Sequence, residues 1–250
     1  MAEMVSTRIN GRWTLALPSH RAARPEWATG WEVARLDAMH KAIRHTDTLY
    51  EVGTEEGDMS ALLAQWCGRI HLFEPNDRVW PNVRAIWDAN GLPAPAGCWS
   101  GFAGDSTEVL GAAWPPDASW PPSAYGPVIG DHGFCQLGER PDLPRIRLDD
   151  YADGTGDPPD VITMDVEGSE LRVLRGAERL LREERPLVFV SVHPESMVMH
   201  YGDYENELHH YMAGLGYEGA WLAHDHETHY LFQHPLTARL GVTPREVYSL

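Results

Sequence analysis

Apolar residues recur along this chain at two spacings, and stretches of one spacing alternate with stretches of the other. Short apolar runs predict buried strands, whereas apolar residues three or four positions apart predict helices. Strands are expected at 48–53, 69–74, 96–103, 161–164 and 187–190. Helices are expected from near Asp58 to Trp66, at 77–89, at 169–183 and at 206–215. This alternation is typical of a mostly parallel sheet with helices on both faces.

The start of the chain adds elements outside this alternation. Residues 7–17 predict a hairpin whose two-residue turn is Asn-Gly, a favoured sequence for such turns. A helix follows over 31–43, with apolar residues at helical spacing. Residues 1–45 are therefore expected to form a hairpin-and-helix cap, in either a binding or a purely structural role.

Residues 104–143 follow neither spacing. The stretch contains Trp-Pro-Pro twice, and a loop of this length in a compact domain is usually functional or disordered. Two interpretations stay open, a partly ordered lid beside an active site and a plain surface insertion. Further on, residues 217–223 and 228–233 predict a C-terminal β-hairpin. The whole chain, 1–250, is expected to form one domain.

The charge of the chain limits the kinds of partner that it is expected to bind. Its 250 residues include 37 acidic and 20 basic side chains, a formal net charge of −17. A surface that binds nucleic acid needs clustered Lys and Arg to neutralise phosphates, and no run of the sequence supplies them. No apolar run approaches the roughly 20 residues of a membrane span, and residues 1–18 do not resemble a signal peptide. We therefore expect a cytoplasmic protein without a nucleic-acid or membrane partner.

The strand expected at 48–53 carries an acid near its end, and a glycine-bearing turn follows. Glu51, Gly53 and Gly57 precede the start of a helix, and the next strand ends at Glu74. Glycines let the backbone approach a ligand closely, and an acid about 20 residues later can accept hydrogen bonds from both ribose hydroxyls. This spacing favours a nucleoside-cofactor site over a turn that needs glycine for conformational reasons alone.

The same loop indicates which nucleoside cofactor to expect. Glu51, Glu55, Glu56 and Asp58 place four carboxylates where a pyrophosphate-binding loop would offer bare backbone amides. Carboxylates repel a pyrophosphate, but they suit a cofactor that carries a sulfonium and an ammonium group. The loop therefore predicts S-adenosylmethionine rather than a dinucleotide.

Two groups of residues, one in each half of the chain, carry a family resemblance. The first comprises Glu-Val-Gly-Thr-Glu-Glu-Gly at 51–57, Phe-Glu-Pro at 73–75 and Asn90. The second comprises Leu-Asp-Asp-Tyr at 148–151, Met-Asp-Val-Glu-Gly-Ser-Glu at 164–170 and Val-Leu-Arg-Gly-Ala at 173–177. Over residues 45–233 the chain resembles the FkbM-type S-adenosylmethionine-dependent methyltransferases. The resemblance implies a class I methyltransferase-like (Rossmann-like) α/β fold.

The chain departs from that family's pattern at four places. Glu51 and Glu55 stand where the family usually has Asp and Asn, and Thr163 stands where it usually has Lys. An acid is common near the end of the following strand, where this chain reads Ser-Val-His at 191–193. Glu55 and Thr163 keep open an alternative, a protein of this fold that binds a ligand or has a structural role without turnover.

Ligands of such sheets bind at the carboxyl ends of the strands, and this rule brings the motif residues into one site. Glu51 is expected at the methionine end of the cofactor, Glu74 at its ribose, and the backbone near Phe102 and Ala103 beside its adenine. We assign cofactor binding to the following residues: Glu51, Gly53, Glu55, Gly57, Ser60, Glu74, Phe102, Ala103 and Asp105.

Asp165 and His193 are the predicted catalytic residues. The helix dipole explains an acid such as Glu170 in a first helical turn adequately, but it explains a strand-end acid such as Asp165 poorly. The pair can bind a divalent cation such as magnesium, or it can remove the proton of a substrate hydroxyl, and both alternatives stay open. The acids and histidines of 224–229 are expected to form a solvated turn of the terminal hairpin rather than a metal site.

Together these expectations predict an S-adenosylmethionine-dependent O-methyltransferase that acts on a hydroxyl of a sugar or a glycosylated small molecule. A catalytically inactive binding or structural protein of the same fold is the first alternative, because fold alone does not establish activity. A nicotinamide-dependent oxidoreductase is the second alternative, and the acidic loop counts against it.

Overall fold

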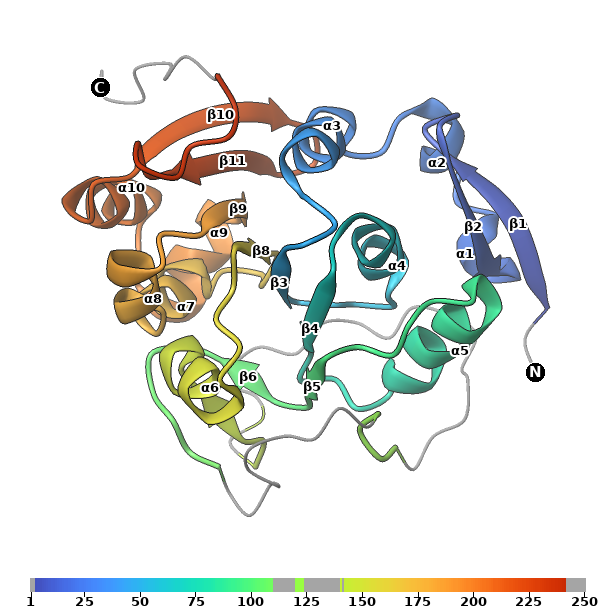
Figure 1. Ribbon diagram of the computed structural model, residues 1–250, viewed down its shortest axis with the longest axis horizontal. Helices are drawn as coiled ribbons and strands as arrows, with labels where there is room; N and C mark the ends of the chain where they lie inside the picture. The colour runs from blue at the N-terminus through green and yellow to red at the C-terminus, as the bar shows by residue number, and fades with distance from the viewer. Residues whose placement is uncertain (1–2, 110–119, 124–139, 141, 242–250) are drawn as a thin grey trace.

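A seven-stranded sheet forms the centre of the computed structural model, which describes residues 3–109, 120–123, 140 and 142–241 (Figure 1). The strand order is β10–β11–β9–β8–β3–β4–β5. The strands from β9 to β5 are parallel, and they comprise β9 (Leu187–Val192), β8 (Val161–Met164), β3 (Thr48–Val52), β4 (Arg69–Phe73) and β5 (Gly97–Trp99). β11 (Thr228–Gln233) runs antiparallel between β9 and β10 (Glu218–His224), which confirms the expected C-terminal hairpin.

Helices cover both faces of this sheet (Figure 1). Alternate side chains of β9 pack on opposite faces: Val188 and Val190 belong to one hydrophobic core, and Leu187 and Phe189 belong to the other. A strand that is apolar on both faces is expected at the centre of a parallel sheet. The first core includes residues of α6 (Leu148–Thr155), α7 (Glu170–Arg175), α8 (Glu178–Glu183) and α10 (Glu205–Gly214). The second includes residues of α3 (Val33–Ala42), α4 (Asp58–Trp66) and α5 (Trp80–Asn90).

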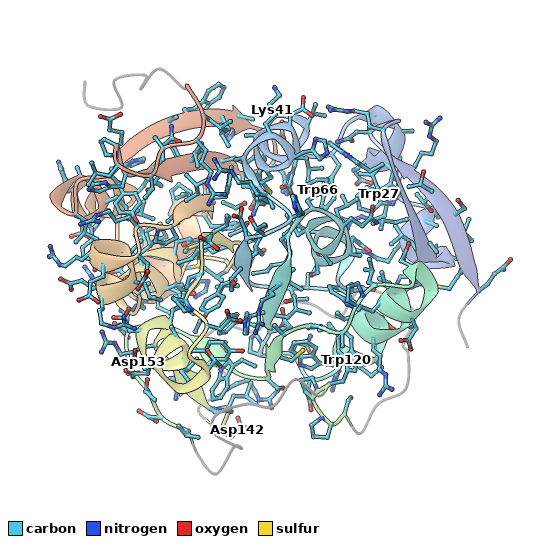
Figure 2. The ribbon with its side chains drawn as sticks, in the orientation of Figure 1. Trp27, Lys41, Trp66, Trp120, Asp142 and Asp153 are labelled. Atoms are coloured by element: carbon cyan, nitrogen blue, oxygen red, sulfur yellow. The ribbon has the colours of Figure 1, made fainter. Side chains whose placement is uncertain are left out.

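The N-terminal segment contains the expected hairpin, formed by β1 (Met4–Ile9) and β2 (Trp13–Pro18), and two short helices that were not predicted, α1 (Ser19–Ala22) and α2 (Glu26–Thr29). Asn90 of α5 holds the hairpin, because its side chain exchanges hydrogen bonds of 2.8 and 2.9 Å with the backbone of Ala16. Trp27 of α2 is buried beside the hairpin (Figure 2). Its indole N–H donates to the carbonyl of Arg21 at 2.6 Å.

Two expected elements are each divided in two, and a glycine in close contact with distant backbone lies at each division. The strand expected at 96–103 becomes β5 and β6 (Phe102–Ala103), and β6 pairs with β7 (Arg145–Ile146) in a separate two-stranded sheet. At the division, a Cβ on Gly101 would lie 2.5 Å from the carbonyl oxygen of Pro144. The helix expected at 169–183 becomes α7 and α8, and a Cβ on Gly176 between them would lie 1.8 Å from the carbonyl oxygen of Gly104. Neither site accommodates a side chain.

Three further helical segments were not predicted from the sequence pattern. They are α6, α9 (Pro194–Ser196) and the π-helical turn η1 (Met197–Tyr201), which together with α9 follows the end of β9. Most of the 104–143 insertion, for which a lid was one interpretation, lies outside the described residues. Among the helices that the structure describes, none combines the length and apolar character needed to cross a membrane.

Candidate active site

A cavity of about 740 Å³ opens at the carboxyl ends of the parallel strands. Glu51 and Glu74 line it from β3 and from the end of β4, and Asp165 and His193 line it directly after β8 and β9. Residues between Arg24 and Arg35 and the hairpin turn at 225–227 supply further walls. This placement follows the general rule that open α/β sheets bind ligands at their carboxyl edge.

The glycines of the loop after β3 are required by backbone conformation and packing. Gly53 has a φ of 88°, and a Cβ at this position would lie 1.9 Å from the carbonyl oxygen of Asp165. Gly57 has a φ of 90° directly before α4, and a Cβ there would lie 3.1 to 3.3 Å from Val83. Gly53 lines the cavity, whereas Gly57 does not line it and packs closely against Val83 of α5. Gly53 therefore also brings the end of β3 directly against Asp165.

Glu74 is buried at the end of β4 and accepts backbone hydrogen bonds on both carboxylate oxygens. The amide of Glu55 donates to Oε2 at 3.0 Å, and the amide of Asn76 donates to Oε1 at 2.8 Å. Burial raises the pKa of Glu74 to about 7, although these backbone bonds act in the opposite direction. An ionised carboxylate offers about four acceptor positions. Glu74 can therefore accept further hydrogen bonds from a ligand.

Glu51 is almost fully buried in β3, and its Oε2 has no hydrogen-bond partner among the described residues. Burial raises the pKa of Glu51 to about 8, and the neighbouring Ser60 hydroxyl reduces this shift. A buried carboxylate without a partner is costly to ionise. A positively charged ligand group in the cavity would stabilise its ionised form.

The other acids of the loop are paired with basic side chains of the N-terminal segment, an arrangement that the sequence pattern did not indicate. Arg21 of α1 donates to Asp58 at 2.5 Å and to Glu55 at 3.2 Å. His20 lies 2.8 Å from Glu56. Of the four carboxylates expected to repel a pyrophosphate, three are thus paired, and the electrostatic argument from the loop rests mainly on Glu51.

The remaining predicted cofactor residues divide into two groups. Phe102 and Ala103 of β6 line the cavity, and so does Glu55. Asp105 is exposed and lies 3.7 Å from Arg172. Ser60 is fully buried within α4, and it contributes to the site through Glu51 rather than through the cavity wall.

Asp165 and His193 are brought together as predicted, with 3.6 Å between Asp165 Oδ1 and His193 Nε2. Glu170 does more than cap α7, because its Oε1 lies 2.7 Å from His193 Nδ1 and also accepts the amide of Gly168 at 3.0 Å. Burial alone would lower the pKa of His193, but hydrogen bonds to Glu170 and to Glu227 raise it to about 11. Burial, together with the charge of Glu227, raises the pKa of Asp165 to about 8.

The hairpin turn is only partly the solvated turn that was expected. His224 and His226 are exposed, but Glu227 and His229 are buried and point inward. In the strand register, His229 pairs with Ser191 and Thr228 pairs with Val192. The next position along this register places Glu227 opposite His193, and the Glu227 carboxylate contacts His193 Nε2. His229 Nδ1 lies 3.0 Å from the Ser191 hydroxyl. The expectation was therefore wrong for Glu227 and His229, because strand alternation turns them toward the site.

A charged pair from α3 completes the site and was missed in the sequence. Arg35 is buried, and it donates to Glu32 at 2.7 Å and to the Thr163 hydroxyl at 3.1 Å. It also lies 3.7 Å from Asp165. Charged residues are seldom fully buried unless they are paired. The detectable signal was their spacing, since positions 32 and 35 share a helix face with the core residues at 36 and 39.

Comparison with known proteins identifies the family. Residues 51–218, about two thirds of the chain, match the methyltransferase FkbM domain. The chain belongs to the FkbM methyltransferase family. Curated proteins gave no match.

Solved structures show the same fold for this FkbM-family chain. Methyltransferase FkbM from Methylobacillus flagellatus KT is similar with a TM-score of 0.52 at 20% identity, over 76% of this chain and 44% of that chain. The chain therefore spans less than half of that protein's length. An O-methyltransferase from Bacillus cereus in complex with SAH has a TM-score of 0.48 at 14% identity, over 86% and 83% of the two chains. A ribosomal protein L11 methylase from Lactobacillus delbrueckii subsp. bulgaricus has a TM-score of 0.48 at 10% identity, over 81% and 77%. The expected class I methyltransferase-like fold is thus confirmed.

The structure also shows what surrounds two positions at which this FkbM-family chain departs from the family pattern. At Thr163, where the pattern has Lys, Arg35 brings a guanidinium from α3. At His193, directly after the strand near whose end the pattern has an acid, Glu227 brings a carboxylate from the hairpin. Cationic and anionic groups are therefore present in this region, but they come from other elements.

Two sets of side chains in the site have the composition and spacing to hold a metal ion. Asp165, His193 and Glu227 form one set, and Glu32, Glu227 and His229 form the other. In each set the three donor atoms lie within 4.8 Å of one another.

Proposed function

We propose that this chain is an S-adenosylmethionine-dependent O-methyltransferase whose acceptor is a hydroxyl of a sugar or of a glycosylated small molecule. The observation that carries the proposal is the division of the cavity into two halves. Glu51 and Glu74 lie at the ends of β3 and β4, and Asp165 and His193 lie at the ends of β8 and β9. The first half suits the cofactor, and the second suits proton chemistry on an acceptor.

In the cofactor half, each proposed contact matches a property of the free side chain. Glu74 retains acceptor positions for the two ribose hydroxyls. Glu51 Oε2 accepts no hydrogen bond from the described residues, and the cationic methionine end would supply a donor there. Phe102 and Ala103 offer an apolar border for the adenine. Residues 1–45 act as a cap in this proposal, because Arg21 holds the loop after β3 and Trp31 lines the cavity.

In the acceptor half, the hydroxyl oxygen attacks the methyl carbon and the carbon–sulfur bond breaks. The electron pair of that bond stays on sulfur, and the hydroxyl proton must leave. Asp165 is the proposed acceptor of this proton, since 32% of its side chain is exposed toward the cavity. His193 is held between Glu170 and Glu227, and it stabilises the ionised form of Asp165 from 3.6 Å. Positioning of the hydroxyl in line with the methyl group supplies much of the remaining rate.

Replacement of Glu74 by Ala tests the proposal. The ribose hydroxyls would lose their acceptor, so affinity for S-adenosylmethionine should fall by about 1–3 kcal/mol in titration calorimetry. Asp153→Ala is the matched control, because Asp153 is an exposed acid of α6 outside the cavity and should retain wild-type affinity. Unchanged affinity in a folded Glu74→Ala protein would overturn the assignment.

The two alternative functions are separated by the same titration. A nicotinamide dinucleotide should give no binding heat, and strong binding of it would favour an oxidoreductase. Binding of S-adenosylmethionine without methyl transfer to any of a panel of sugars and glycosylated small molecules would favour the inactive alternative.

A further inference from the structure

Four carboxylates lie within 4 Å of the ring nitrogens of His193, whereas one carboxylate would balance the charge of a protonated imidazole. Its Nδ1 is 2.7 Å from Glu170 Oε1, and its Nε2 contacts Glu227 Oε2. Asp165 Oδ1 and Glu167 Oε2 lie 3.6 and 3.7 Å from the same Nε2. These residues come from the ends of β8 and β9, from α7 and from the hairpin turn, so the tertiary fold gathers them at one side of the cavity.

The orientation of the ring is that of a metal-binding histidine. Such a histidine usually donates one ring N–H to a carboxylate and presents the other nitrogen to the metal. Glu170 occupies the first role, since it is fully buried and is itself held by the amide of Gly168. Nε2 is then directed toward Asp165 and Glu227 at the cavity wall.

Two buried carboxylate oxygens beside this ring accept no hydrogen bond from the described part of the chain. They are Oε2 of Glu170, a fully buried residue, and Oε1 of Glu227, a residue that is 6% exposed. Glu227 Oε1 lies 3.0 Å from Nε2 of the exposed His226, without hydrogen-bond geometry. Arg35 is already shared between Glu32 and Asp165. Buried carboxylates in excess of their counter-charges are costly, and a bound dication would offset that cost.

We propose that His193, Asp165 and Glu227 bind one divalent transition-metal ion, with Glu170 as the residue that orients the imidazole. The donor atoms of the three ligands lie within 4.8 Å of one another, and Glu227, which contacts Nε2 directly, would move away from the ring to admit the ion. One imidazole with two carboxylates suits Mn²⁺, Co²⁺ or Zn²⁺ better than Mg²⁺ or Ca²⁺, which prefer oxygen ligands alone. The site adjoins the acceptor half of the proposed function, where a metal ion would bind the acceptor hydroxyl and lower its pKa; this role rests on that proposal.

Titration of chelator-treated protein with Co²⁺ tests the site directly. Visible absorption and calorimetry should show one ion per chain. His193→Ala should abolish the absorption, and Glu227→Gln should weaken binding at least about tenfold. Glu170→Gln should weaken binding about 10–100-fold although it donates no ligand atom. His224→Ala is the matched control, because His224 is an exposed histidine of the same hairpin and should leave the affinity unchanged.

Binding of S-adenosylhomocysteine, the demethylated cofactor, reports whether each variant is folded. A variant that binds it but not Co²⁺ has lost the metal site alone. The proposal is overturned if wild-type protein that binds S-adenosylhomocysteine takes up no Co²⁺, or if His193→Ala binds Co²⁺ as the wild type does. Loss through His229→Ala but not through His193→Ala would overturn it in favour of the set formed by Glu32, Glu227 and His229. If S-adenosylhomocysteine does not bind while Co²⁺ does, the proposed function fails and the metal site stands.

Discussion

A buried histidine, His71, and a half-buried histidine, His193, each contact a carboxylate, and they differ in almost every other respect. His71 of β4 lies 2.7 Å from Asp157 through Nε2 and 3.0 Å from the Tyr151 hydroxyl through Nδ1. His193 follows β9 and contacts Glu170 and Glu227 through its two ring nitrogens. Burial lowers the pKa of His71 further than Asp157 raises it, whereas the carboxylates around His193 overcome burial and raise its pKa to about 11.

The difference lies in what surrounds each ring. His71 packs edge-on against Tyr50 and Tyr151, with ring centroids 5.0 and 5.5 Å away, and it does not line the cavity. Such a histidine completes a core. His193 faces the cavity and has several carboxylates within 4 Å. A carboxylate partner alone therefore does not indicate function; an excess of carboxylates at a cavity wall does.

The largest expected difference between the two histidines is in turnover. His193→Ala should reduce kcat at saturating S-adenosylmethionine by roughly 10²–10⁴-fold, the usual cost of losing proton transfer, because Asp165 would no longer be held in its ionised form. Its affinity for S-adenosylhomocysteine should stay near the wild-type value, because His193 lies in the acceptor half. Asp165→Asn should act similarly. A His193→Ala enzyme with near-wild-type kcat would reduce His193 to a packed strand-end residue like His71.

A second expected difference is in stability. His71→Ala removes hydrogen bonds to Tyr151 and Asp157 inside a packed aromatic cluster, and the free energy of unfolding should fall by about 1–3 kcal/mol. Urea denaturation measures this change. The kcat of the folded variant should equal that of the wild type. A kcat reduced as far as in His193→Ala would show that His71 has a role in turnover and not only in the core.

A third expected difference is a pair of opposite pH dependences of the unfolding free energy. Folded His71 has a lowered pKa, so below about pH 6.5 the unfolded chain binds a proton that folded His71 does not, and acid removes stability. In chelator-treated protein, folded His193 has a raised pKa, so its contribution is complete below about pH 6.5 and is lost as the pH rises toward 11.

The measurement compares the unfolding free energy of the wild type with that of His71→Gln and of His193→Gln between pH 5.5 and 9.5. The wild-type advantage over His193→Gln should shrink with rising pH, by at most about 1.4 kcal/mol per pH unit. The advantage over His71→Gln should grow between pH 5.5 and 7. Parallel pH profiles for the two variants would contradict the assigned charge states.

Much of the fold could be predicted because its causes are local. Apolar period and turn residues lie within a few positions of one another, so they determined the parallel strands, most helices and the terminal hairpin. The helix at 169–183 and the strand at 96–103 were each predicted as continuous. At both divisions a glycine contacts backbone far away in the sequence, Gly176 at Gly104 and Gly101 at Pro144, and a local pattern does not record such contacts.

The sequence by itself determined which strand-end residues form the site. Each of these residues stands at or beside the end of a strand, and strand ends meet at one edge of the sheet. All of them line the cavity: Glu51, Gly53, Glu74, Asp165 and His193. Only the tertiary structure decided their partners. Arg35 donates to Thr163, which lies 128 positions away in the sequence. Arg21 of α1 pairs with Asp58. Strand register brings Glu227 to His193. Charge balance in a buried site depends on side chains that converge from separate elements, and no local pattern in the sequence records that convergence.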